Sequence, residues 1–179
     1  MPFRKCAAKP CGGSLINRST LAWILYFAHQ YDRAIEACRS SLELDPNFFV
    51  AHRYLGLAYE QKGMYAEAID EFQKALTLSN GTTLMKAHLG HAFAVAGKTN
   101  EAQQILDELK DRASQVYVPA YHIAVIHAGL GQTDMAFEWL EKAYEERAEF
   151  MVYLKADPRL DGLRADSRFL ALIGRVGLP

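Results

Sequence analysis

Apolar and small side chains recur along this chain at a fixed interval of 34 residues. Three sets of positions keep that interval: Ala34, Ala68, Ala102 and Ala136; Gly63, Gly97 and Gly131; and Leu21, Leu55, Leu89 and Ile123. Self-similarity at a period of this length is typical of proteins built from stacked structural repeats. The pattern therefore predicts four copies of one unit.

Within one unit the spacing predicts two helices and a turn. Leu55, Gly56 and Tyr59 share one helical face, and the apolar residues after Ala68 repeat the spacing of three and four. Gly63 lies between the two segments, where a residue that adopts positive φ can end a helix. We expect helix pairs over about 15–45, 48–79, 82–113 and 117–147, with Gly56 and Ala68 meeting where two helices cross.

The pattern Leu55-Gly56, Tyr59, Gly63, Tyr65, Ala68, Phe72 and Ala75 resembles the tetratricopeptide repeat. The resemblance implies an all-α fold, a right-handed superhelical solenoid of four helix pairs with a concave inner groove. It places the repeats at about 15–46, 47–80, 81–114 and 115–148. Residues 1–14, rich in Pro, Gly and basic side chains, are expected to form a mobile leader.

Residues 149–179 are predicted to form a C-terminal capping segment. A fifth first-helix is expected at 149–155, stopped by Asp157-Pro158, and Asp166 is a suitable N-cap for a last helix at about 167–175. That helix should cover Phe137, Trp139 and Tyr144. The tail resembles the end of tetratricopeptide arrays in bacterial multidomain signalling proteins. In those proteins the array follows a serine/threonine kinase or a winged-helix DNA-binding domain. The motifs of those upstream domains do not occur here, so their activities are not carried over.

Composition narrows the class of protein. A length of 179 residues fits one domain, and a net charge of −1 argues against a nucleic-acid binder. The most apolar run, from Leu21 to Ala28, is too short to span a membrane. Cys6, Cys11 and Cys38 lack metal-ligand spacing and are expected to be reduced, as in a cytoplasmic protein.

No motif of nucleophilic, metal-dependent or phosphate-binding catalysis occurs, so the sequence predicts no enzyme and no cofactor. The family resemblance instead selects first-helix positions for the inner wall of the groove. The predicted partner-binding residues are Trp23, Tyr26, Phe27, Arg53, Tyr54, Leu57, Glu60, His88, His91, Tyr121, His122 and Val125. Ser19 and Trp23 occupy the positions where some relatives hold a peptide carboxylate with Lys and Asn, so that clamp is not expected.

The sequence favours a protein–protein interaction scaffold that binds a peptide or helix of a partner in its groove. One alternative is a regulatory module of a bacterial signalling or transcription system that acts in trans. A second is a metal- or pH-responsive binder that uses His88, His91 and His122, although no metal site is predicted. The first helix is apolar nearly all round, which favours weak self-association through it.

Overall fold

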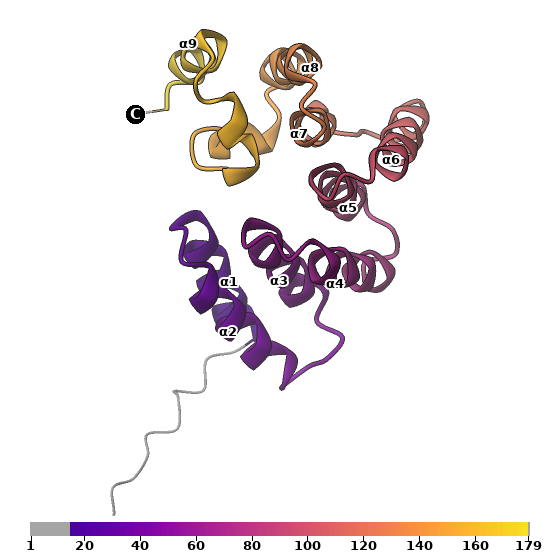
Figure 1. Ribbon diagram of the computed structural model, residues 1–179, viewed down its shortest axis with the longest axis vertical. Coiled ribbons are helices and arrows are strands. Elements are labelled where there is room, and N and C mark those ends of the chain that lie inside the picture. Colours follow the sequence, from indigo (N-terminus) through magenta and orange to yellow (C-terminus); the bar gives the residue numbers. More distant parts are fainter. Residues whose placement is uncertain (1–14, 179) are drawn as a thin grey trace, which may run out of the picture.

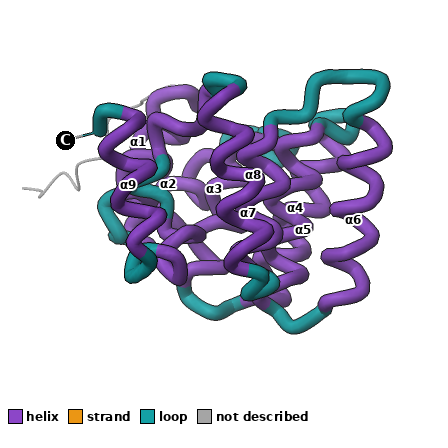
Figure 2. The backbone as a smooth tube through the Cα atoms, turned by 90° about the horizontal axis from the view of Figure 1, so that it is seen from above, coloured by secondary structure: helices purple, strands orange, loops and turns teal. Residues whose placement is uncertain are grey.

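The computed structural model describes residues 15–178, and within them it contains helices and loops and no strand (Figures 1 and 2). The expected all-α class is confirmed. The four helix pairs are α1 (Leu15–Phe27) with α2 (Tyr31–Leu42), α3 (Phe49–Gln61) with α4 (Tyr65–Leu78), α5 (Thr83–Val95) with α6 (Thr99–Arg112), and α7 (Ala120–Gly129) with α8 (Thr133–Glu145). The predicted leader at residues 1–14 lies outside the described residues.

The two helices of a pair pack closely because small residues recur at their contact. Ala34, Ala68, Ala102 and Ala136 are all fully buried. A Cβ atom at Gly56 would lie 2.7 Å from the ring of Phe72, which follows Ala68 by one helical turn on α4, and the predicted contact of Gly56 with Ala68 itself stays a prediction. The glycine is thus needed to admit an aromatic ring from α4 against α3.

The turn inside each pair uses a residue in the left-handed region. Gly63, Gly97 and Gly131 have φ values of 72°, 74° and 71°. His29 occupies the equivalent position in the first pair, with φ of 56°. A side chain in this conformation is strained, so the first turn departs from the glycine rule that the other three follow.

The segment after α8 does not form the predicted fifth first-helix. It forms two short 3₁₀ helices, η1 (Glu149–Tyr153) and η2 (Pro158–Leu163), separated by a turn. The Asp157 carboxylate caps η2 by accepting a hydrogen bond from the Arg159 amide, and Pro158 occupies the first turn. We call residues 149–164 the strap.

The chain ends in α9 (Ser167–Val176), which packs on α8. Asp166 caps this helix as predicted, because its carboxylate accepts from the Arg168 amide. The Arg168 guanidinium lies 4.2 Å from the centroid of the Phe137 ring, and that of Arg175 lies 4.4 Å from the centroid of the Tyr144 ring. Trp139 is instead flanked by Lys142 and Lys110.

None of the described helices is both long and apolar enough to cross a membrane. Cys38 is fully buried in the contact between the first two pairs, and burial raises the pKa of its thiol to about 12. A thiol with such a pKa stays protonated and unreactive at neutral pH.

Candidate functional site

The strap lies across the concave side of the solenoid, between α7 and the first two helix pairs (Figure 1). It packs on α7 through η2, and Leu154, Leu160 and Leu163 of the strap are buried. The concave surface is therefore not the open groove that the sequence predicted. It is filled over much of its length by a segment of the same chain.

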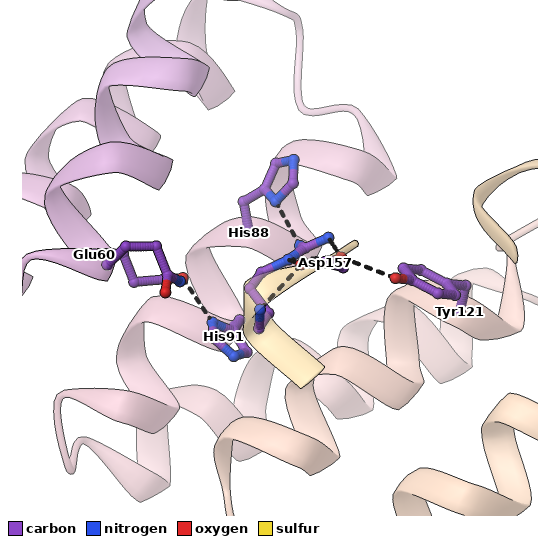
Figure 3. Close-up of polar contacts among 7 residues, drawn as sticks. Glu60, His88, His91, Tyr121 and Asp157 are labelled. Carbon is purple, nitrogen blue, oxygen red and sulfur yellow. Dashed lines mark hydrogen bonds and ion pairs between the residues drawn. The ribbon is translucent and has the colours of Figure 1, made fainter. Parts of the chain in front are cut away.

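A buried ion pair anchors the strap. Oδ2 of Asp157 lies 2.6 Å from Nη2 of Arg159, and Asp157 is 1% exposed. The Tyr121 hydroxyl on α7 donates to Oδ2 of Asp157 over 2.8 Å, and Nη1 of Arg159 donates to Nδ1 of His88 on α5 over 2.9 Å (Figure 3). Two residues of the strap thus connect two different repeats through hydrogen bonds.

The carboxylate of Asp157 and the guanidinium of Arg159 stabilise each other's charged forms. Burial alone would raise the pKa of Asp157, but the Arg159 guanidinium and the Tyr121 hydroxyl outweigh it and hold that pKa below its usual value. Burial, followed by the nearby charge of Arg159, holds the pKa of His88 well below its usual value. His88 is therefore a neutral acceptor for Arg159, and the cluster is one ion pair with neutral neighbours.

An aromatic cluster connects the other end of the strap to the first repeat. The ring of Tyr153 stacks on Phe27 with 5.2 Å between centroids and meets Trp23 edge-on at 5.9 Å. Phe150 lies 5.1 Å from the ring of His122 on α7. Because α1 and α7 contact the same segment, the strap closes the solenoid into a ring.

The twelve predicted groove residues differ in their exposure. Nine of them are buried: Tyr26, Tyr54, Leu57, Glu60, His88, His91, Tyr121, His122 and Val125. Trp23, Phe27 and Arg53 remain partly exposed. The expectation that all twelve face an open groove is thus wrong, because the strap covers the wall, while binding of a partner by any of them stays a prediction.

The three groove histidines act separately. His88 accepts from Arg159, and Nδ1 of His91 lies 3.0 Å from Oε1 of Glu60 (Figure 3). Neither ring nitrogen of His122 has a hydrogen-bond partner. Burial, then the charge of Arg159, lowers the pKa of His122 to about 4. Among the described residues no group of three or more His, Cys, Asp or Glu side chains is arranged to hold a metal ion.

Two openings remain beside the strap. The larger, which we call the seam pocket, has a volume of about 470 Å³ between the first repeats and η1; its lining includes Trp23, Phe27, Arg53, Tyr54, Phe150 and Tyr153. The smaller, of about 300 Å³, lies at the opposite ends of α3, α5 and α7 and includes Glu60, His91, Gly129 and Arg159. The seam pocket contains all three of the accessible predicted residues.

Sequence reasoning missed the strap residues Phe150, Tyr153, Asp157 and Arg159. One signal was present: the inner positions of α5 and α7 carry Tyr, His and Val with no permanent charge, a composition suited to a covered wall. A second was the acid and base two residues apart at 157 and 159, which can pair locally when buried.

Comparison with known proteins agrees with this architecture. Models of the tetratricopeptide repeat match residues 19–81 and 120–150, together more than half of the chain. A curated relative from barley (Hordeum vulgare), SPINDLY, described as a probable UDP-N-acetylglucosamine–peptide N-acetylglucosaminyltransferase, is 28% identical over 123 residues. The match covers 64% of this chain and 13% of SPINDLY, so this chain corresponds to a small part of that protein.

Solved structures share the arrangement of helices. PilW, a type IV pilus biogenesis factor, superposes with a TM-score of 0.59 at 16% identity over 92% of this chain and 79% of PilW. YrrB, described as having an unusual peptide-binding site, gives 0.50 at 21% identity over 90% of this chain and 84% of YrrB. At these identities the likeness shows the fold alone. With its 34-residue period, its matches to the repeat models and its right-handed solenoid of helix pairs, the chain belongs to the tetratricopeptide repeat family.

Proposed function

We propose that this protein is an interaction scaffold that binds a peptide of a partner protein at the seam pocket. The tetratricopeptide fold supports a protein or peptide partner, and YrrB shows that the fold accommodates a peptide-binding site. The strap leaves the seam pocket as the larger opening on the concave side, so a partner reaches the predicted groove residues there.

The observation that carries the proposal is that the guanidinium of Arg53 has no carboxylate partner among residues 15–178. Its guanidinium donates to the Tyr54 hydroxyl and lies 4.2 Å from the centroid of the Tyr54 ring, and within residues 15–178 it contacts no carboxylate. Its Nε atom is buried without a hydrogen-bond partner. A partly buried cation without a counter-ion favours an anionic ligand, since pairing offsets the cost of its desolvation.

Carboxylates of this chain do not fill that role. Asp157 lines the pocket, but both of its oxygens are engaged by Arg159 and Tyr121. Glu149 also lines it and is exposed to solvent. A second unpartnered donor lines the same pocket, the hydroxyl of Tyr26, whose residue is 1% exposed. The unsatisfied groups favour an acceptor from outside the chain.

The walls of the pocket favour an apolar neighbour for that acceptor. Trp23 and Phe27 meet edge-on with 5.9 Å between ring centroids, and Tyr153 contacts both. Aromatic rings offer a large contact area with little loss of conformational entropy. The preferred ligand is an extended peptide with an aromatic or large aliphatic side chain next to an acidic group.

A displayed peptide library tests this directly. The expected result is enrichment of peptides that pair an aromatic with an acidic residue. The chain has two tryptophans, Trp23 and Trp139, so a Trp139→Phe variant makes Trp23 fluorescence report on the pocket during titration of a selected peptide. Trp23→Ala should weaken binding by more than about 1 kcal/mol, as for an anchor residue.

Matched arginine variants test the anionic part. Arg53→Gln should weaken binding and reduce its dependence on salt, whereas Arg33→Gln, on the exposed surface of α2, should leave both unchanged. Enriched peptides without acidic residues, or equal effects of the two arginine variants, would contradict the assignment of Arg53. Binding that survives Trp23→Ala would place the partner elsewhere.

A further inference from the structure

The outer face of α1 breaks the burial pattern of the repeats. Leu21 is 46% exposed, while its counterparts Leu55, Leu89 and Ile123, at intervals of 34 residues, are 4%, 5% and 1% exposed. Ile24 is 53% exposed, and its counterparts Ala58, Ala92 and Ile126 are fully buried. The same two positions are thus interior in three repeats and surface in one.

The internal interfaces show what normally covers these positions. Helices α3, α5 and α7 each pack against both helices of the preceding repeat. At the contact between α4 and α5, for example, the ring of Phe72 stacks on His88 with 5.5 Å between centroids. Thr20 is the counterpart of His88 in α1 and is exposed. Within residues 15–178 no helix occupies the corresponding place on α1.

The exposed side chains on this face of α1 are all uncharged. The exposed side chains of α1 are Ile16, Asn17, Thr20, Leu21 and Ile24, and none of them carries a charge. When a surface of this kind meets its own copy across a two-fold axis, apolar side chains face apolar side chains and no like charges oppose each other. An uncharged face is therefore complementary to itself.

The two ends of the described solenoid differ. The α8 end is covered by α9, where Arg168 pairs with Asp134 and Arg175 pairs with Glu141, and both arginines are exposed. A head-to-tail contact would place the uncharged α1 face against these charged groups. A closed pair of α1 faces avoids that contact and uses the same patch on both partners.

We propose that the outer face of α1 is a self-docking surface, through which two copies of this protein pair across a two-fold axis. A helix of 13 residues offers a strip about 20 Å long and about 10 Å wide. That is well below the roughly 800 Å² per partner of a standard stable interface. The pair is accordingly weak and forms reversibly as concentration rises.

Sedimentation velocity or light scattering of the full chain tests the pairing. Over roughly a hundredfold range of concentration, the average mass should rise from the 20.1 kDa of the monomer toward twice that value and no further. Ile24→Glu should keep the mass at the monomer value, since it places an unpaired charge in the contact. Because Ile24 is half exposed, circular dichroism of this variant should match the parent.

Two further variants separate this arrangement from its rivals. Leu170→Glu changes a leucine on α9 that is 66% exposed, more than Ile24, and should leave the association unchanged. An equimolar mixture of Leu21→Glu and Leu21→Lys should dimerise again, because Leu21 lies at the middle of α1, where a two-fold axis through this face brings the opposite charges together. A parent that stays monomeric at every concentration, association lost in Leu170→Glu, or a mixture that stays monomeric would each overturn the proposal.

Discussion

The hydroxyl of Tyr121 on α7 donates a 2.8 Å hydrogen bond to Oδ2 of Asp157 in the strap. Both residues are 1% exposed, so this bond and the adjacent ion pair lie in the interior of the ring. The arrangement fixes the strap by polar contacts of defined geometry, in addition to the apolar contacts of its leucines.

Asp157→Asn should destabilise the protein by about 3–5 kcal/mol, because it leaves the buried guanidinium of Arg159 without its counter-ion. Asp161→Asn is the matched control, since Asp161 is exposed and pairs with Arg164 at the surface. That change should cost less than about 1 kcal/mol. Urea denaturation measures both, and equal losses would mean that the cluster at Asp157 is not a special anchor.

Tyr153→Ala should loosen the first repeat, because Tyr153 supplies the ring contacts of the strap with Trp23 and Phe27. Hydrogen exchange should become faster in α1, while α5 and α6 keep their protection. The neighbouring residue Val152 is 59% exposed, so Val152→Ala serves as the control and should leave exchange in α1 unchanged. Protection of α1 that is the same in both variants would show that the ring closure adds no stability to the first repeat.

Two glycines with opposite surroundings should respond oppositely to alanine. Gly56→Ala brings a methyl group to 2.7 Å from Phe72 and should cost about 1–3 kcal/mol. Gly174→Ala, within α9, meets nothing within 4 Å and should stabilise by about 0.5–1 kcal/mol through helix propensity. Thermal unfolding of the two variants compares them, and a neutral Gly56→Ala would mean that the Phe72 ring moves aside at little cost.

The first turn offers a stabilising change. His29 adopts positive φ where the other three repeats have glycine, and its side chain makes an exposed hydrogen bond of 2.7 Å to the Tyr31 hydroxyl. His29→Gly should relieve the backbone strain and raise stability by about 0.5–1 kcal/mol. The reverse exchange, Gly63→Ala, should cost about 1 kcal/mol or more. Loss of stability in His29→Gly would show that the bond to Tyr31 outweighs the strain.

Acid should weaken the fold through His122. Its pKa is about 4 in the folded protein, against about 6.5 for a histidine exposed to water, so the unfolded chain binds the proton first as pH falls. The contribution of His122 to the free energy of unfolding is therefore fully present above about pH 6.5. It declines between about pH 6.5 and pH 4, by about 3 kcal/mol if this residue acts alone. His122→Phe removes no hydrogen bond and should flatten this part of the profile.

His52 should give a contribution of the opposite sign. It lies 2.5 Å from Glu71, and this hydrogen bond, partly opposed by burial, raises the pKa of His52 above its usual value. The stability from this pair is present below the unfolded pKa and is lost as pH rises through the folded one. His52→Gln should therefore reduce stability more at pH 6 than at pH 9. A pH profile unchanged in both histidine variants would contradict these two assignments.

The sequence was sufficient for the repeats because their determinants are local and periodic. Ala68 and Phe72 specify how α4 packs on α3, and Gly63 specifies the turn between them. The residues that determine one unit therefore all lie within 34 positions of sequence. The assignment of residues such as Tyr121 and His122 to the inner wall came from the family resemblance. Their cover followed from neither the period nor the resemblance, because the strap has no period and its contacts are made with residues distant along the chain.

Asp157-Pro158 illustrates the difference. The pair was interpreted as a helix stop, and Pro158 does begin η2 instead of continuing a helix. That Asp157 would be buried depends on Tyr121 and on His88, the partner of Arg159, which belong to two other repeats. Local spacing predicts a turn at Asp157-Pro158, but it does not predict how deeply the residues of that turn are buried.

The ring also imposes an order on folding during synthesis. His88 and Arg159 meet across 71 positions of sequence, whereas helix pairs form from neighbours. All four repeats therefore leave the ribosome before the strap does, since domains assemble from the N-terminal side as the chain emerges. Until residues 149–164 emerge, Tyr121 and His122 of α7 lack the cover that Phe150 and Asp157 give them in the folded protein. The nascent protein thus passes through a stage in which the contact surface of the strap on α7 is available to chaperones, and synthesis of the strap ends that stage.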